Sequence, residues 1–402
     1  MQDKKAFFSL PENIHYLNCA TMSPLPKIVE EAGIKGLLRK SQPYEISQEH
    51  FFDTAIHVKK KFAKLINCPD YEQIAIMPSV SYGMATVVKN ILKKGIPNQK
   101  TKVVLVGEEF PSDVYAWGEL ISENPKVSIE TIQAPLNLEN RGKNWNEALL
   151  KALNSEALAV CISPTHWADG TLFNLEKIKE KCLQNGILLI IDATQHLGAY
   201  AFDIQEIRPD FLVAATYKWL LGPYGTTLAY FGKYFDDGFP LEQTWIGRKN
   251  SQDFKNLINY QTDYQEGAFR YNMGEFSNFI NLPMVEKALD LLIEWQPEEV
   301  QNYAKNLAKP FIERLRKAGY WIENEDFRSA HLFGIRLPKD LKIETIQKAL
   351  SDEKVFVSYR GNAIRLSINV WNDENDMELF TKTLEKNSLY PTKIIILKNK
   401  TP

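Results

Sequence analysis

The sequence lacks any run of about 18 consecutive apolar residues, the length that a membrane-spanning helix needs. Before Pro11 there is only a short apolar patch, too short for the apolar region of a secretory signal. Cysteine is also scarce, and the four cysteines form no CxxC pair, which argues against a disulfide framework and against a metal site. We therefore expect a cytoplasmic protein. The cysteines are Cys19, Cys68, Cys161 and Cys182.

Neither sign of charge dominates. The 402 residues include 48 Lys and Arg against 50 Asp and Glu, a formal net charge of −2. Proteins that bind the phosphate backbone carry a basic excess, so nucleic acid is not an expected partner. At about 150 residues per domain, the length predicts two or three domains.

Short apolar runs alternate with helix-like stretches between residues 73 and 231. Because the runs are continuous and not alternating, both faces of each strand are expected to be buried. This pattern predicts an α/β domain over residues 21–282, a mainly parallel sheet flanked by helices, one of them around 145–153. The runs cover residues 73–77, 103–106, 157–162, 187–191, 211–215 and 227–231.

The second half of the chain changes character. Residues 235–282 lose periodicity, and long excursions of this kind are usually functional or interface-forming. A smaller α+β domain is expected over residues 283–402, including a linking helix at its start. Its predicted elements are a strand at 331–337, a helix at 342–351, strands at 355–359 and 363–368, a helix at 373–386 and a late edge strand at 393–397.

The residues that follow the apolar runs are the informative ones, because ligands of open α/β sheets sit beyond the carboxyl ends of the strands. Ser79, Val80 and Ser81 follow the first run and open a helix, where free N–H groups and the helix dipole favour an anion. The simpler reading of Ser79 is a helix N-cap.

An aspartate and a lysine follow two further runs. Asp192 comes directly after Ile191, a position where a lone aspartate is most often a cap or turn residue. Lys218 lies in an apolar, aromatic loop, and a desolvated lysine becomes a usable amine nucleophile. Taken together with the anion cradle, these are the parts that hold pyridoxal phosphate (PLP): the lysine forms a Schiff base and the aspartate pairs with the pyridinium nitrogen.

The segments 192–195 and 210–225, with Lys218 before the Gly222-Pro223 turn, resemble the class V aminotransferase group of fold-type I PLP enzymes. This group includes cysteine desulfurases, kynureninases and isopenicillin-N-epimerase-like proteins. The resemblance extends from Tyr16 to about Asn372. It implies a fold-type I architecture, PLP as cofactor, an amino-acid substrate, and an N-terminal segment of residues 1–20 at the active-site entrance.

The resemblance also implies roles for individual residues. Lys218 matches the Schiff-base lysine, Asp192 the partner of the pyridine nitrogen, and Gln195 the residue that bonds the cofactor's phenolic oxygen. The implied phosphate ligands are Val80, Ser81 and Tyr217.

Two loops match positions around the cofactor ring. Phe110 would stack on the ring and Asp113, in the same loop, would help to orient the cofactor. In the loop after the third run, His166 is the favoured contact on the cofactor's O3′ side, with Thr165 as the rival.

Further matches concern the substrate and a second subunit. Arg365 matches the arginine that binds the substrate α-carboxylate, for which a guanidinium fork is suited. Segment 270–278, with Gly274 and Ser277, resembles the excursion that reaches the neighbouring subunit's phosphate, so a homodimer is implied. Trp167 and nearby aromatics are candidates for a pocket lining or for ordinary packing.

The sequence departs from the family pattern in two places. Residues 357–363 contain no cysteine where desulfurases carry one, which leaves Cys19 as the thiol to test. Gln195 replaces the histidine of kynureninases, although Phe110, Asp113 and Tyr217 resemble that enzyme.

The reaction subtype stays open at this stage. With Lys218 as the natural base for the α-proton, we rank an aminotransferase first, a C–S or C–C lyase second and an amino-acid epimerase third. A non-catalytic ligand-binding protein is the contrasting class, and the intact set of Lys218, Asp192 and Arg365 argues against it.

Overall fold

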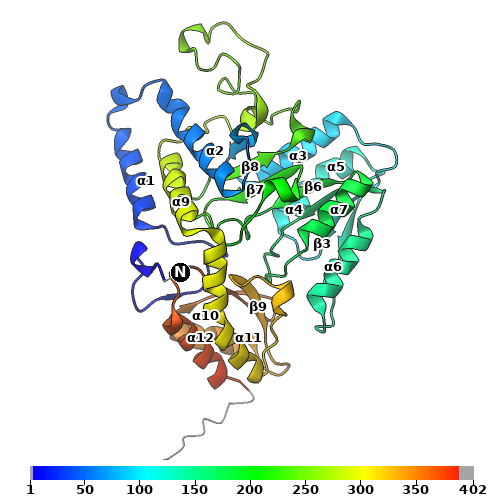
Figure 1. Cartoon of the computed structure of the whole chain (residues 1–402), viewed down its shortest axis with the longest axis vertical. Helices are drawn as coiled ribbons and strands as arrows, with labels where there is room; N and C mark the ends of the chain where they lie inside the picture. Colours follow the sequence, from blue (N-terminus) through cyan, green and yellow to red (C-terminus); the bar gives the residue numbers. More distant parts are fainter. Residues whose placement is uncertain (1–2, 389–402) are drawn as a thin grey trace, which may run out of the picture.

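The computed structural model describes residues 3–388 and contains a seven-stranded sheet (Figure 1). β8 runs antiparallel to both of its neighbours, and the strands from β7 to β4 are parallel. All six predicted apolar runs are confirmed as strands. In spatial order the strands are β2 (Ile74–Met77), β8 (Thr227–Phe231), β7 (Phe211–Ala215), β6 (Leu188–Asp192), β5 (Ala157–Ile162), β3 (Lys102–Val106) and β4 (Ser128–Ile132).

Helices cover both faces of this sheet. Ala75 and Met77 of β2 share a core with α3 (Val80–Lys94) and α5 (Trp117–Glu123), and α4 (Pro111–Tyr115) lies between these helices in the chain. Ile74 and Ile76 point to the opposite core. The helices of that opposite core include α1 (Lys27–Arg39), α2 (Asp53–Leu65), α6 (Arg141–Ala152), α7 (Leu175–Asn185), α8 (Ile204–Ile207) and α9 (Asn281–Trp295).

The C-terminal part carries a small antiparallel sheet of β11 (Ser358–Arg360), β12 (Ala363–Ser367) and β9 (Leu332–Arg336). The expected strand at 355–359 is divided: β10 (Val355–Phe356) pairs instead with β1 (His15–Tyr16). This pairing joins the N-terminal segment to the small unit. The helices of the small unit are α10 (Pro297–Lys317), α11 (Ile343–Asp352) and α12 (Glu374–Lys386).

The apolar face of α9 packs on α1 and α2, so the expected boundary after residue 282 falls where a helix of the large core begins. From Ala304 onward, α10 contributes to the core of the small unit. The division at 20 and 282 stays a proposal. The expected strand at 393–397 lies outside the described residues.

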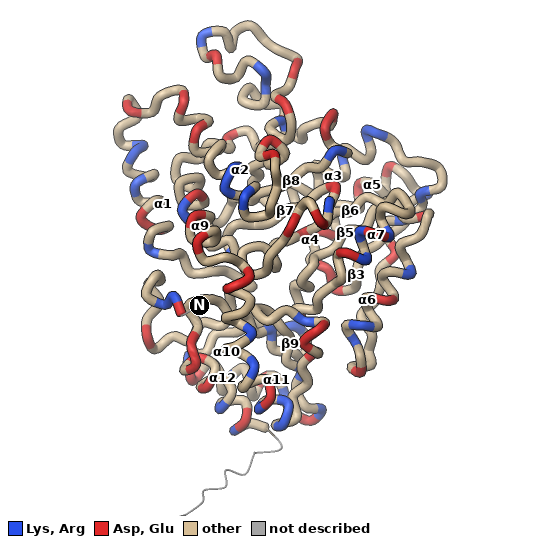
Figure 2. The backbone as a smooth tube through the Cα atoms, viewed as in Figure 1, with Lys and Arg blue, Asp and Glu red and all other residues tan. Residues whose placement is uncertain are grey.

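The expected excursion at 235–282 is irregular up to α9 and includes the lime-green loop that projects above the body in Figure 1. Basic and acidic residues are interspersed along the described backbone, in keeping with the balanced charge (Figure 2). Among the described residues, no helix is both long and apolar enough to cross a membrane.

Candidate active site

A cavity of about 230 Å³ opens at the carboxyl ends of the central strands. Its lining comes from the turns that follow β2, β3, β5, β6 and β7, as the position of the polar residues in the sequence predicted. The predicted residues found in the lining are Val80, Ser81, Phe110, Asp192, Gln195, Tyr217 and Lys218.

The N-terminus of α3 forms one end of the cavity. Ser79 is the N-cap, and its Oγ accepts a hydrogen bond of 3.1 Å from the Tyr82 N–H. The hydroxyls of Ser79 and Ser81 lie 2.9 Å apart. Free N–H groups of the first turn and the helix dipole make this end suited to an anion. The capping role of Ser79 and the anion cradle are therefore compatible.

Lys218 enters the cavity from the turn after β7 and is buried, with 7% of its surface exposed. Its Nζ lies 5.5 Å from the ring centre of Phe110 and 5.4 Å from that of Tyr217. Burial lowers the pKa of the Lys218 amine to about 8, against an opposing effect of Asp192. At neutral pH a fraction of this amine is thus unprotonated and nucleophilic.

Two buried carboxyls belong to this part of the molecule, one in the cavity lining and one next to it. Asp192 ends β6, and its Oδ1 accepts a hydrogen bond of 2.9 Å from the Thr194 N–H. Asp113 in α4 is fully buried beside Asp192. Burial, and then the nearby charge of Asp192, raise the pKa of Asp113 well above its usual range. Asp113 therefore holds its proton to a higher pH than an exposed aspartate does.

Both polar atoms of the Gln195 side chain are hydrogen-bonded. Its Nε2 donates to the Ala20 carbonyl at 3.0 Å, and its Oε1 accepts from Trp219 Nε1 at 2.7 Å. The neighbouring Cys19 is buried, and burial raises the pKa of its thiol to about 12. The N-terminal segment thus reaches the site and orients an amide in its lining.

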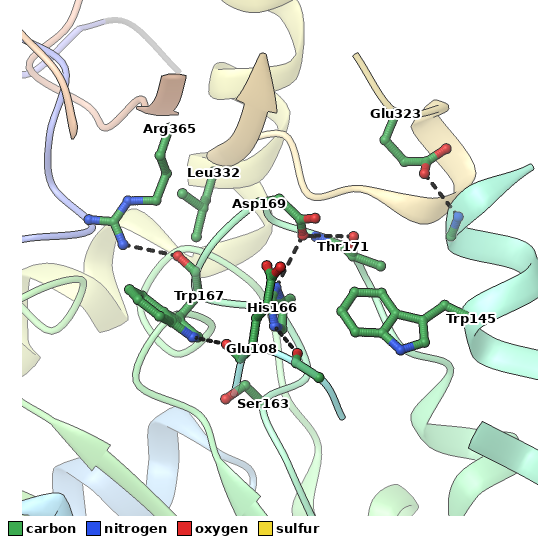
Figure 3. Close-up of polar contacts among 12 residues, drawn as sticks. Glu108, Trp145, Ser163, His166, Trp167, Asp169, Thr171, Glu323, Leu332 and Arg365 are labelled. Carbon is green, nitrogen blue, oxygen red and sulfur yellow. Dashed lines mark hydrogen bonds and ion pairs between the residues drawn. The ribbon is translucent and has the colours of Figure 1, made fainter. Parts of the chain in front are cut away.

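The loop after β5 places its residues differently from expectation (Figure 3). His166 is fully buried outside the lining, with Nδ1 3.2 Å from Asp169 Oδ1 and Nε2 3.2 Å from the Gly107 carbonyl oxygen. Thr165 is also buried, with its Oγ1 2.9 Å from His196 Nδ1. Ser163 and Trp167 are the residues of this loop that line the cavity.

The His166–Asp169 contact belongs to a buried ionic network. Arg141 of α6 pairs with Asp169 at 2.8 Å. Burial alone would raise the pKa of Asp169, but the hydrogen bond with His166 and the charge of Arg141 hold it below its ordinary value. His166 therefore acts in the structure as a support for the loop that carries Trp167.

Arg365 on β12 approaches the same loop (Figure 3). Its Nη1 donates to the Trp167 carbonyl at 2.9 Å, its Nη2 to Thr21 Oγ1 at 2.7 Å and its Nε to Ser358 Oγ at 2.8 Å. No carboxylate in the described part lies within ion-pair distance, so the guanidinium keeps its charge available for a ligand.

Gly274 and Ser277 do not line this chain's cavity. The Gly274 N–H donates to Glu242 Oε2 at 2.6 Å, and Ser277 Oγ donates to the Phe51 carbonyl at 2.6 Å. Both residues lie on the excursion, and their expected role concerns a neighbouring subunit, which a single chain does not contain.

Several lining residues were not singled out from the sequence. Ser163 follows β5 and donates its hydroxyl to Glu109 Oε1 at 2.9 Å, and Thr194 follows β6 and accepts from the Ala215 N–H at 3.1 Å. Their position directly after buried strands was the available signal. Within residues 3–388, no three His, Cys, Asp or Glu side chains are grouped so as to hold a metal ion.

The family model for class V aminotransferases matches residues 16–380. The chain belongs to this family. The class V aminotransferase relatives include YcbU of Bacillus subtilis (strain 168), an uncharacterized aminotransferase, 26% identical over 82% of this chain and 84% of the relative. They also include the uncharacterized aminotransferase C777.03c of Schizosaccharomyces pombe, 23% identical over 94% of this chain and 93% of the relative.

Among solved structures, the chain is similar to a mutant of C-DES with glycine covalently linked to its PLP cofactor. The TM-score is 0.82 at 17% identity, covering 95% of this chain and 98% of that one. This likeness confirms the predicted fold-type I class. The class V resemblance noted from the Asp192 and Lys218 segments is confirmed as well.

Proposed function

We propose that this class V protein is a PLP-dependent aminotransferase that acts on an amino acid. The observation that carries the proposal is the meeting of Lys218, Asp192 and the N-terminus of α3 in one cavity. Each of these three features has a different chemical role, and together they match the different ends of PLP.

The residues present fit the cofactor. The first turn of α3, Ser81 and Tyr217 would hold its phosphate, and Asp192 would pair with its ring nitrogen. Phe110 would cover the ring. The amine of Lys218, 5.5 Å from the Phe110 ring centre, would bond the aldehyde carbon. When bound, the cofactor withdraws electrons from the substrate carbon and so weakens its α-C–H bond.

The protein's own groups would supply the rest. Lys218, with a pKa near 8, can accept and return a proton near neutral pH. Arg365 would hold the α-carboxylate, since three hydrogen bonds fix the direction of its fork.

The cysteines bear on the choice of reaction. All four are buried, and Cys19, the one near the site, has a thiol pKa of about 12, so a thiolate is scarce at neutral pH. The scarcity of thiolate argues against a desulfurase reaction that uses the protein's own thiol, and so favours transamination. A lyase that needs no enzyme thiol is the second candidate, since C-DES, a cystine C-S lyase, shares this fold.

We also propose a homodimer in which residues 270–278 of each chain reach the neighbouring site. An apolar face on α1 supports an interface: Ile34, Leu37 and Leu38 are 52%, 58% and 62% exposed at helical spacing. α1 lies beside the residue that follows this segment, because a Cβ at Gly36 would meet the Phe279 carbonyl oxygen at 2.3 Å.

An amino-acid panel with mass analysis of cofactor and product separates the reactions. Conversion of the cofactor to its amine form with release of a keto acid supports the aminotransferase. A keto acid released together with ammonia or sulfide supports the lyase, and exchange of the α-hydrogen without net product supports the epimerase. A purified protein that takes up no cofactor contradicts the whole proposal.

A further inference from the structure

A second arginine stands beside Arg365. In the β11–β12 hairpin, Ser358 pairs with Arg365 and Arg360 pairs with Ala363. Cross-strand partners share a face, and so do residues two apart on one strand. The register therefore directs Arg360 and Arg365 to the same face of the hairpin as diagonal neighbours.

Both guanidinium groups lie against one indole. The Cζ of Arg360 is 4.7 Å from the Trp167 ring centre, and that of Arg365 is 5.9 Å away. The indole is itself fixed, because its Nε1 donates to the Glu108 carbonyl at 2.5 Å (Figure 3). Trp167 lines the cavity and packs edge-on against Phe110 at 5.5 Å between ring centres. The two charges are thus placed at the rim of the proposed active site.

Neither charge has a counter-ion in the part of the chain that the structure describes. The recorded ion pairs of residues 3–388 include no carboxylate on Arg360 or Arg365. Among residues 3–388, Arg360 donates only to the carbonyl of its neighbour Tyr359, at 2.6 Å, and its buried Nε–H has no acceptor there. Burial, followed by the like charge of Arg360, lowers the pKa of Arg365. Two like charges that share a partly buried space are stabilised by anions placed between or beside them.

The two forks are not equivalent. Arg365 is anchored by Ser358, Trp167 and Thr21, and it is among the charges that act on the Lys218 amine. Most N–H groups of Arg360 make no hydrogen bond within the described residues. Arg360 is also more exposed than Arg365 and lies next to the hairpin turn. An α-carboxylate near Lys218 suits Arg365, and a second anionic group farther along the substrate suits Arg360.

We propose that Arg360 and Arg365 form a site for two carboxylates, so that the substrate is an amino acid with a carboxylate on its side chain. This inference rests on the proposed function, because it takes Lys218 as the reacting group. Trp167 then positions the two forks and is not a wall for a bulky aromatic side chain.

The test uses the cofactor-loaded protein and acids that lack an amino group, so that no reaction intervenes. Calorimetric titrations compare succinate and glutarate with butyrate. We expect wild type to bind the better dicarboxylate about tenfold or more tightly than butyrate. Arg360→Gln should reduce that ratio to near one and leave butyrate unchanged, and Arg360→Lys should retain part of it. Lys348→Gln, which removes an exposed charge from α11, serves as the matched control and should change neither.

Two results would overturn the inference alone: a loaded wild type that binds glutarate and succinate no better than butyrate, or an Arg360→Gln variant that loses affinity for all three acids equally. The second result would mean that both arginines share a single carboxylate. A protein that takes up no cofactor would instead overturn the proposed function, and this inference with it.

Discussion

Lys218 gives the most direct test at the scale of single residues. Lys218→Ala should abolish the visible absorbance of the lysine-bound cofactor, because no other lysine of the described residues lines the cavity. Lys143→Ala, at an exposed position of α6, is the control and should keep the colour. The absorbance spectrum after incubation with PLP is the measurement. Retention of the colour in the Lys218 variant would refute the assignment.

The same residue predicts a pH dependence. Only the neutral amine can attack the cofactor's aldehyde, so the rate of uptake by cofactor-free protein should rise as pH increases through about 8, the lowered pKa of Lys218. A lysine with an ordinary pKa would give a rise near about 10.4 instead. Stopped-flow absorbance over a pH series distinguishes the two.

Asp113 predicts an effect on stability. Below the ordinary pKa of aspartate, Asp113 is protonated in both the folded and the unfolded protein. Its ionisation then makes no contribution to the free energy of unfolding. Above that pKa the unfolded chain ionises first, because the pKa of Asp113 is raised in the folded chain, so Asp113 lowers the free energy of unfolding as pH rises through this range. Asp113→Asn, which has no proton to lose, should therefore raise the Tm of the cofactor-free protein at pH 7 by a few degrees.

This gain should fade as the pH approaches the ordinary aspartate value, and Asp340→Asn on an exposed loop should show no gain at any pH. Differential scanning calorimetry between pH 4 and 8 checks both statements. An Asp113→Asn variant that is less stable than wild type at pH 7 would mean that Asp113 is ionised in the folded protein.

One rule was enough to predict that Asp192 and Lys218 lie near each other, and both line the same cavity. Asp192 and Lys218 each follow a buried parallel strand, and the carboxyl ends of such strands meet at one edge of the sheet. His166 also follows a strand, but its direction depends on Asp169, and Asp169 is fixed by Arg141 from a helix far away in the chain. A long-range contact of this kind leaves no local pattern to read.

At the scale of elements, the approach of α3 to the sheet positions the anion-binding end of the cavity. A Cβ at Gly83 would lie 2.9 Å from Cζ of the fully buried Phe211 ring. Gly83→Ala should therefore push the first turn of α3 outward, costing about 1–3 kcal/mol of stability and weakening binding of PLP.

Gly118→Ala in α5 is the matched control, because its Cβ would meet nothing within 4 Å. Denaturant unfolding and fluorescence titration with PLP measure the two effects. If Gly83→Ala binds PLP as wild type does, the position of α3 does not govern the phosphate end.

Elements were predictable where hydrophobicity was continuous. β4 was missed because it is an edge strand whose Ser128 and Thr131 are exposed, and so it lacks the apolar run of its neighbours. The expected strand at 355–359 divides because β10 pairs with the N-terminal β1 and β11 with β12. Partners so distant in the chain cannot be read from a short window of sequence.

At the scale of the whole molecule, the N-terminal segment connects the two units at the site. Thr21 Oγ1 accepts a hydrogen bond from Arg365 of the small unit. The Ala20 carbonyl accepts one from Gln195 in the cavity lining. A movement between the units would therefore change the distance between Arg365 and Lys218. The family resemblance implied that an N-terminal segment lies at the entrance of the site. It did not predict these individual hydrogen bonds, which are seen only in the structure.

The proposed dimer predicts a change in mass on substitution of the apolar face of α1. Leu38 is 62% exposed there, and Leu38→Lys should convert the dimer to monomers, because a buried charge without a partner is costly in an interface. Leu183→Lys on α7, where the side chain is 66% exposed, is the control and should stay dimeric. Light scattering after size-exclusion chromatography measures both. A Leu38→Lys variant that stays dimeric would show that the interface does not include this face of α1.

The role of residues 270–278 can be tested by complementation within mixed dimers. Lys218→Ala removes the bond to the cofactor, and Ser277→Asp adds a negative charge that repels its phosphate, so each variant alone should lack visible absorbance. If the segment serves the neighbouring site, a mixed dimer contains one site with both Lys218 and an intact segment from the other chain. Random pairing on coexpression should then restore about a quarter of the wild-type absorbance. If each segment serves its own chain, no mixed site is complete and the coexpressed protein stays colourless, while Ser277→Ala controls for loss of the hydrogen bond to Phe51.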